Sequence, residues 1–331
     1  MLQSLALALL ERALGKYVKG LDSGSLEVAI LSGQVVLRAL ELKHEALFEL
    51  GLPVHVQAGF IGRVEVTLPW ARLGSEPIRV VISQVQVVAT PIDPTAWDET
   101  SRDAWRWARK AAELETLTAL HAAVRAHARR EADGAAPDEA ASSSLLSKML
   151  ANVELTLDSI HLRYEDAPAG GGAARAAGVL IARARVHSAD ERWEAAFSAD
   201  PALQRKRVLL ERAQVYVQPA VPAAQLAIGA LRAGGAAAAR AALDACDPPT
   251  GSGVLRPVDL ALRLVVNARA NVGAGEPRVS LGCELPVLRL GLSRAQYISL
   301  CTMAAALSTP LADGAGWRLG ADARRALELS L

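Results

Sequence analysis

The sequence has few cysteines, few aromatic residues and almost no net charge. Its three cysteines, Cys246, Cys283 and Cys301, form no CxxC pair, which argues against both a disulfide framework and a structural zinc site. Aromatic residues make up 4% of the chain and the formal net charge is +1, so bulk charge gives no attraction to nucleic acid. The composition favours a globular protein of a reducing, cytoplasmic compartment.

Motifs that carry catalysis or metal binding are also lacking. The sequence contains no HExxH, GxSxG or GxxxxGK[ST] string and no strand-linked GxGxxG, so we expect no metal, no cofactor and no enzymatic activity. Six histidines fall into no ligand spacing: His44, His55, His121, His127, His161 and His187. The pair Glu165 and Asp166 follows a strand end, where it is either a catalytic base or, as we expect, a structural turn or cap.

No transmembrane helix is expected. The longest weakly apolar stretch, residues 221–245, is rich in alanine and interrupted by Arg232 and Arg240. The N-terminal apolar patch has no preceding basic residue and no convincing cleavage site, so we expect it to be retained as an amphipathic helix. Its residues Leu2, Leu5 and Leu9 either contact a membrane surface or close the end of a sheet.

Most of the chain has the two-residue period of β-strands. Apolar residues alternate with polar ones in 54–60, 63–68 and 260–266, a further strand is expected over 207–217, and turn residues separate the runs. The short connections predict antiparallel neighbours. In residues 152–164 the apolar positions change from odd to even at Asp158 and Ser159, which predicts a bulge, a bend or two strands.

Helical periodicity is restricted to a few segments. We expect helices at the N-terminus, from Asp98 to about residue 131, and from a cap at Ser293 to Met303. Residues 133–144 have the composition of a flexible loop. The predicted organisation is a first sheet segment over 1–95, a helical insertion and loop over 96–150, and a continuation of the sheet with a C-terminal helix over 151–331.

A basic run, Arg205-Lys206-Arg207, interrupts this pattern. Such a run either meets anionic lipid head groups or is solvated surface, which is the commoner case.

Several strings along the chain resemble the chorein N-terminal domain of the vacuolar protein sorting-associated protein 13 family. The strings with this resemblance are Leu14-Gly15-Lys16-Tyr17-Val18, Leu40-Glu41-Leu42, Leu52-Pro53-Val54, Gly59-Phe60-Ile61-Gly62, Leu68-Pro69-Trp70, Ile160-His161-Leu162-Arg163-Tyr164-Glu165-Asp166, Leu255-Arg256-Pro257-Val258 and Leu292-Ser293-Arg294-Ala295-Gln296-Tyr297. The resemblance runs from residue 1 to about residue 311.

This resemblance implies a mainly β fold with flanking helices (α+β): an elongated, twisted antiparallel sheet curled into a hydrophobic groove and capped by the N-terminal helix. It implies lipid transport between organelle membranes, with phospholipids as cargo. The expected location is peripheral on organelle membranes, at endoplasmic reticulum contact sites, where membrane proteins are possible partners. The candidate groove residues are Val54, Val56, Phe60, Val64, Val66, Leu68, Leu155, Leu157, Leu260 and Leu262.

Two alternatives stay open at this point. From alternation alone, the same apolar residues are typical of an ordinary β-sandwich core. The predicted helices are too few to cover about ten strands at about 4.8 Å spacing, which favours a ligand on the apolar face. A chain of this fold can also act as a tether or adaptor that binds a membrane or protein without moving lipid. Bound lipid in stoichiometric amount distinguishes these functions.

Overall fold

The computed structural model describes residues 18–19, 26–29, 34–43, 54–69, 72, 75–91, 151–167, 173–198, 200, 202–244, 252–267 and 277–308. The expected N-terminal helix with Leu2, Leu5 and Leu9, the expected helix over 98–131 and the loop over 133–144 lie outside the described residues.

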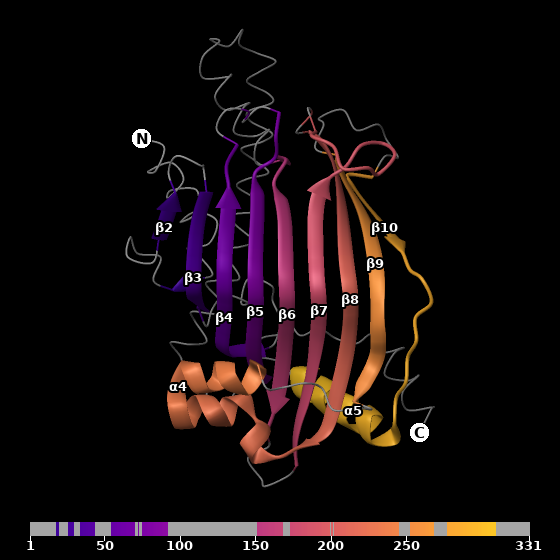
Figure 1. The fold of residues 1–331 in the computed structure, drawn as a ribbon. Coiled ribbons are helices and arrows are strands. Elements are labelled where there is room, and N and C mark those ends of the chain that lie inside the picture. The colour runs from indigo at the N-terminus through magenta and orange to yellow at the C-terminus, as the bar shows by residue number, and fades with distance from the viewer. Residues whose placement is uncertain are drawn as a thin grey trace, which may run out of the picture.

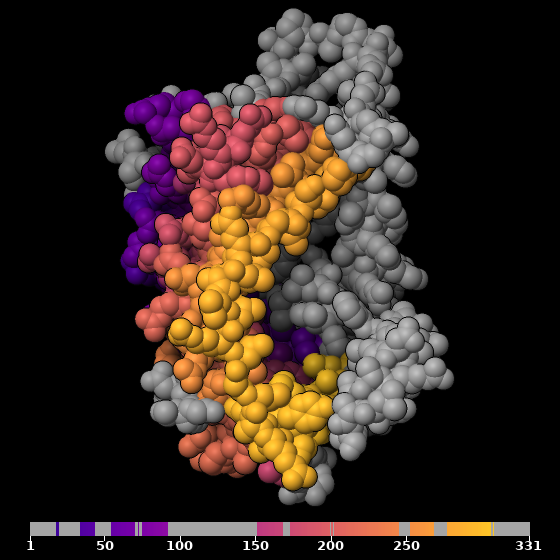
Figure 2. Space-filling model, turned by 90° about the vertical axis from the view of Figure 1, so that its right-hand side faces the viewer, coloured from indigo at the N-terminus to yellow at the C-terminus, as the bar shows by residue number. Residues whose placement is uncertain are grey.

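The described residues form a mainly β structure, as predicted. Ten strands build a single sheet in the order β1-β3-β4-β5-β6-β7-β8-β9-β10, and β2 pairs with β3 off this path (Figure 1). The strands are β1 (Val18–Lys19), β2 (Leu26–Ala29), β3 (Gln34–Leu42), β4 (Val54–Thr67), β5 (Arg79–Pro91), β6 (Glu154–Asp166), β7 (Ala174–Ser188), β8 (Leu203–Val221), β9 (Gly253–Asn267) and β10 (Val279–Glu284). In Figure 2, viewed from the β10 edge, indigo residues of the first strands emerge beside β9, as expected for a twisted sheet.

The sheet is mostly antiparallel, as expected, and contains one parallel pair that was not predicted. β5 pairs with β6 in parallel, whereas the other strand pairs of the described residues are antiparallel. The reason lies in the connection: residues 92–153 separate these two strands, and a connection of more than about a dozen residues lets the chain return to the starting edge of the sheet. Segments on both sides of the insertion therefore share one sheet.

A line of unusual backbone positions crosses the middle of the sheet. Ala39 in β3, Gln84 in β5, Ser159 in β6 and Arg212 in β8 have positive φ angles of 53°, 59°, 55° and 52°. The pairing of neighbouring strands from β3 to β7 skips these positions, so that Ser83 pairs with Asp158 and the next pair is Val85 with Ile160. We call this line the crease; it also passes through Gly62 and Ala182.

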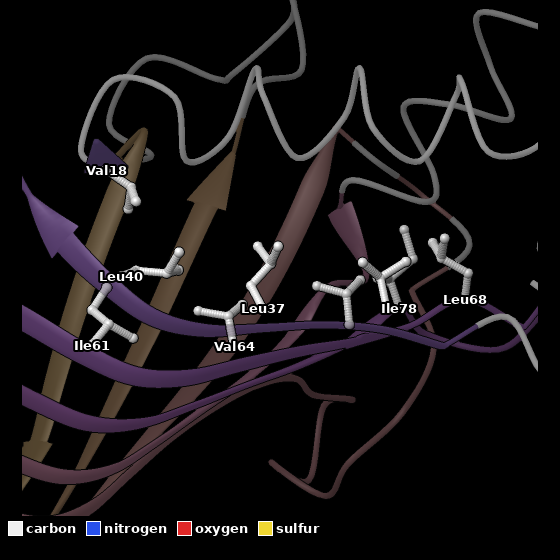
Figure 3. Packing of buried hydrophobic residues seen from close by; sticks show 9 residues of the cluster. Val18, Leu37, Leu40, Ile61, Val64, Leu68 and Ile78 are labelled. Carbon is white, nitrogen blue, oxygen red and sulfur yellow. The ribbon is translucent and has the colours of Figure 1, made fainter. Parts of the chain in front are cut away.

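The crease reverses which residues of a strand face a given side. Leu37 and Leu40 lie three positions apart in β3, yet both belong to one apolar cluster with Ile61 and Val64 of β4. Figure 3 shows Leu37, Leu40 and Val64 gathered on the same side of the sheet. In regular strands residues three apart face opposite sides. The predicted break in residues 152–164 is therefore a reversal at Ser159 within a single strand.

Two helices and a short 3₁₀ helix flank one end of the sheet. After η4 (Ala223–Gln225), α4 (Ala227–Asp244) packs against β4 and β5. Gly235, with φ 72°, breaks α4, and Figure 1 shows its two halves side by side. α5 (Arg294–Ser308) packs against β8. Its predicted cap is confirmed, because the Gln296 amide donates to Ser293 Oγ at 3.2 Å.

Candidate functional site

One face of the sheet carries apolar side chains across seven strands. Paired residues of neighbouring strands share a face, so the register defines rows that run across the strands. On one side of the crease there are two such rows. The first contains Val35, Val66, Val80, Leu155, Val186, Val208 and Leu262. The second contains Leu37, Val64, Ile82, Leu157, Ala184, Leu210 and Leu260.

Two further rows continue this face on the other side of the crease. One contains Leu40, Ile61, Val85, Ile160 and Ile181, and the other contains Gly59, Val87, Leu162, Val179 and Val215. Without the reversal, these residues would face the opposite side. We call the four rows the apolar rows and their side of the sheet the apolar face. The first two rows extend from β3 to β9 over six strand spacings, about 29 Å at about 4.8 Å each, whereas the third spans β3 to β7 and the fourth β4 to β8.

The structure places nine of the ten predicted groove residues on the apolar face. Val64, Val66, Leu155, Leu157, Leu260 and Leu262 belong to the apolar rows, and Leu68 joins the same cluster as Val64. Val56 pairs with Ala89 and Val54 with Pro91, and a bulge separates both from Ala58. Because Ala89 and Pro91 follow Val87 at steps of two, Val54 and Val56 share its face.

Phe60 lies on the opposite face. It belongs to a cluster with Ala58, Val88, Ala227 and Leu243, where α4 covers the sheet. Strict alternation from Val56 to Phe60 misses the bulge between Val56 and Ala58, which moves Phe60 to the other side.

Sequence reasoning missed other members of the rows, among them Val80, Ile82, Val208 and Leu210. In their strands both the odd and the even positions are apolar, so the sequence pattern does not show which residues lie on which face of the sheet.

The apolar rows become more exposed toward β10. Val64 in β4 is 0% exposed, Leu157 in β6 and Leu210 in β8 are half-buried, and Leu281, which pairs with Leu264 next to the rows, is 70% exposed. Exposed apolar surface of this extent needs an occupant or a partner, since it is unfavourable in water. The face is therefore the candidate binding surface of the described structure.

Charged side chains occupy the other face, which we call the polar face. Arg183 Nε donates to Asp158 Oδ1 at 2.6 Å, and Arg185 Nη2 donates to Glu211 Oε1 at 2.5 Å. These cross-strand pairs are partly exposed, so each contributes at most about 1 kcal/mol. Their main consequence is that the sheet is amphipathic, with solvated charges on one side and apolar rows on the other.

A buried polar network attaches α4 to the polar face. Glu165, whose side chain is 0% exposed, accepts hydrogen bonds from the Ala227 and Ile228 amides at 2.9 and 3.0 Å. Arg163 Nε donates to Glu165 Oε1 at 2.6 Å, and its Nη1 donates to Tyr216 Oη at 3.1 Å. The carboxylate thus caps the positive end of a helix that begins 62 residues later.

His161 completes this network and is held neutral. Its Nε2 lies 2.8 Å from Tyr216 Oη. Burial and, to a smaller extent, the nearby Arg163 charge lower the pKa of His161 to about 4, although the Glu165 carboxylate opposes them. The string from Ile160 to Asp166 therefore has a structural role, because its alternate residues His161, Arg163 and Glu165 form hydrogen bonds on the side of the sheet that α4 covers.

The remaining ionisable groups of the described part of the chain include an ion pair and two thiols. Asp166 forms an ion pair with Arg175 at 3.6 Å. No three His, Cys, Asp or Glu side chains of the described residues come together as metal ligands would. Cys283 is exposed and Cys301 half-buried, and both are free thiols.

These features agree with comparisons to known proteins. The VPS13-like family N-terminal region matches residues 1–218, about two thirds of the chain. The chain belongs to this family.

Relatives with similar sequences are lipid transfer proteins by name. The chain is 31% identical over 221 residues to "Intermembrane lipid transfer protein VPS13" of Chaetomium thermophilum, covering 65% of this chain and 7% of the relative. It is 24% identical over 300 residues to "Intermembrane lipid transfer protein VPS13A" of Mus musculus, covering 90% of this chain and 9% of the relative. The chain thus spans less than a tenth of the length of these relatives.

Proposed function

We propose that this chain is a non-enzymatic lipid transfer module that binds the acyl chains of glycerophospholipids along the apolar rows. The observation that carries the proposal is that two of these rows are continuous from β3 to β9. The family name and the names of the relatives support lipid as the ligand.

A continuous apolar surface is what the energetics of lipid movement require. At about 0.8 kcal/mol per methylene, transferring the roughly thirty methylenes of a two-tailed lipid into water costs on the order of 24 kcal/mol. Contact with the rows removes most of this barrier. Because the rows run across the strands, a tail moves from one strand to the next without meeting the charged pairs of the polar face.

The proposed place of action is the surface of organelle membranes at contact sites, including those of the endoplasmic reticulum. Association is peripheral, and membrane proteins at these sites are candidate partners. Among the residues that the structure describes, no helix is both long and apolar enough to span a bilayer.

The test is native mass spectrometry of the purified chain, combined with extraction and identification of bound lipid. Leu209 and Leu210 provide a matched pair of variants, because they are adjacent in β8 and face opposite sides. Leu210 lies in the apolar rows, whereas Leu209 pairs with Arg185 on the polar face. We expect Leu210→Glu to reduce bound lipid more than about tenfold, because a carboxylate is costly to bury beside acyl chains, and Leu209→Glu to retain it.

Two outcomes of these measurements would contradict the proposed lipid binding. A lipid-free chain whose apolar face is filled by protein would contradict the proposal and favour the tether or adaptor function. Equal lipid loss in both variants would show that binding does not depend on the apolar face.

A further inference from the structure

The basic run Arg205-Lys206-Arg207 is divided between the two faces of the sheet. Arg207 pairs with His187 and Arg263 on the polar face, and Arg205 forms a surface ion pair with Glu191 at 3.2 Å. Lys206 lies between them and points to the other side. It precedes Val208 of the apolar rows by two residues, which places it on the apolar face about 7 Å beyond the last row.

Lys206 is held in place by two oxygen atoms at the edge of this face. Its Nζ donates to Ser188 Oγ at 2.9 Å and to the Ala151 carbonyl, and Ser188 Oγ donates to the same carbonyl at 3.2 Å. An ammonium group has three N–H donors, and these contacts use two of them. Ser188, Lys206, Leu264 and Leu281 form the next row, so apolar residues adjoin the ammonium group.

This charge is not neutralised locally. In its own row and the two adjoining apolar rows, Lys206 is the one charged side chain among the described residues. Burial lowers the pKa of Lys206, and the Glu154 carboxylate opposes that effect only in part. At the opposite end of the strands, Asp166 and Arg175 pair with each other at 3.6 Å, so their charges cancel. The two edges of the apolar face therefore differ: one carries a cation that forms no ion pair with a carboxylate of the described residues.

We infer that Lys206 binds the phosphate group of a lipid whose tails lie along the apolar rows, so that head groups gather at the Ser188–Lys206 edge. This inference rests on the proposed function. A phosphate accepts the remaining N–H of the ammonium and supplies the negative charge that the site lacks. The spacing of about 7 Å between Lys206 and the nearest row leaves room for the glycerol backbone.

The experiment compares two lipids with identical tails, phosphatidic acid and diacylglycerol, offered in equal amounts to the 331-residue chain. Native mass spectrometry gives the ratio of the two bound lipids. Lys206→Met should lower the ratio of phosphatidic acid to diacylglycerol about tenfold, as loss of one charge-assisted hydrogen bond does. Lys206→Arg should keep the ratio near that of the wild type. The control Arg205→Met removes the same charge from the polar face and should leave the ratio unchanged.

A second measurement needs only the wild-type chain. Acylation of Lys206 by an amine-reactive ester, followed by peptide mass spectrometry, should be slower in the phosphatidic acid complex than in the diacylglycerol complex. An unchanged lipid ratio in Lys206→Met, an equal change in Arg205→Met, or equal acylation in both complexes overturns the inference and leaves acyl-chain binding intact. Absence of both lipids from the wild-type chain overturns the inference together with the proposed function.

Discussion

Replacing Glu165 tests whether the network of His161, Arg163 and Glu165 holds α4 on the sheet. Glu165→Gln removes a carboxylate that is fully buried, forms an ion pair with Arg163 at 2.6 Å and accepts the amides of Ala227 and Ile228. Loss of one partner leaves the buried Arg163 charge uncompensated, which costs about 3–5 kcal/mol. The glutamine oxygen still accepts one amide, so the loss of the cap itself adds at most about 1 kcal/mol.

The free energy of unfolding, from urea denaturation followed by circular dichroism at pH 7, measures this effect. We expect Glu165→Gln to lower it by about 3–5 kcal/mol. The control is Asp158→Asn, which breaks the partly exposed pair with Arg183 and should cost at most about 1 kcal/mol. Adding Arg163→Met to Glu165→Gln should restore part of the loss, because no unpaired charge then remains buried. A Glu165→Gln variant no less stable than Asp158→Asn would refute this account of the network.

Three further predictions concern stability. The folded chain keeps His161 neutral down to about pH 4, whereas the unfolded chain takes up its proton near pH 6.5, so the free energy of unfolding should fall by about 3 kcal/mol between these pH values. In His161→Phe, the free energy of unfolding measured by denaturation between these pH values should lack this fall. A fall as large as that of the wild type would contradict the assignment to His161. Gly178→Ala places a Cβ 2.4 Å from the buried Tyr216 ring and should lower the free energy of unfolding by about 1–3 kcal/mol. In the control Gly282→Ala the new Cβ lies 3.6 Å from its nearest neighbour, so the cost should be small. Equal melting temperatures of the two variants would argue against the close contact between Gly178 and Tyr216. At the crease, Ser159→Val should destabilise the chain by about 1–2 kcal/mol more than Ser159→Gly, because β-branched residues disfavour positive φ. Equal stability of the two variants in chemical denaturation would refute the left-handed conformation of Ser159.

Local patterns in the sequence predicted the mainly β fold and several of its details. Alternation in 54–68 and 260–266 marks β4 and β9, Ser293 marks the start of α5, and the change of parity at Ser159 marks the crease in β6. Each of these features depends on residues close together in the chain, which is why the sequence displays them.

Features that depend on distant residues were not predicted. The alanine-rich α4 carries no local capping residue, because its cap is Glu165, 62 residues away. The parallel pairing of β5 with β6 follows from a long connection whose path the sequence does not encode locally. Strict alternation predicted that Phe60 lies on the apolar face. The bulge between Val56 and Ala58, which moves Phe60 to the polar face, is visible only in the pairing of β4 with β5. The facing of Val208 and Leu210 likewise requires the register, since both parities of that strand are apolar.

The most direct measurement of the central claim is photocrosslinking with a phospholipid that carries a diazirine in its acyl tail, with the labelled positions in β8 mapped by peptide mass spectrometry. Because Arg212 lies on the crease, labels should fall on even-numbered Val208 and Leu210 before it and on odd-numbered Ala213 and Val215 after it. Leu209 and Glu211 should remain unlabelled. Labels on Leu209 or Glu211, or on both odd and even positions on one side of Arg212, would contradict the binding of acyl chains along the apolar rows.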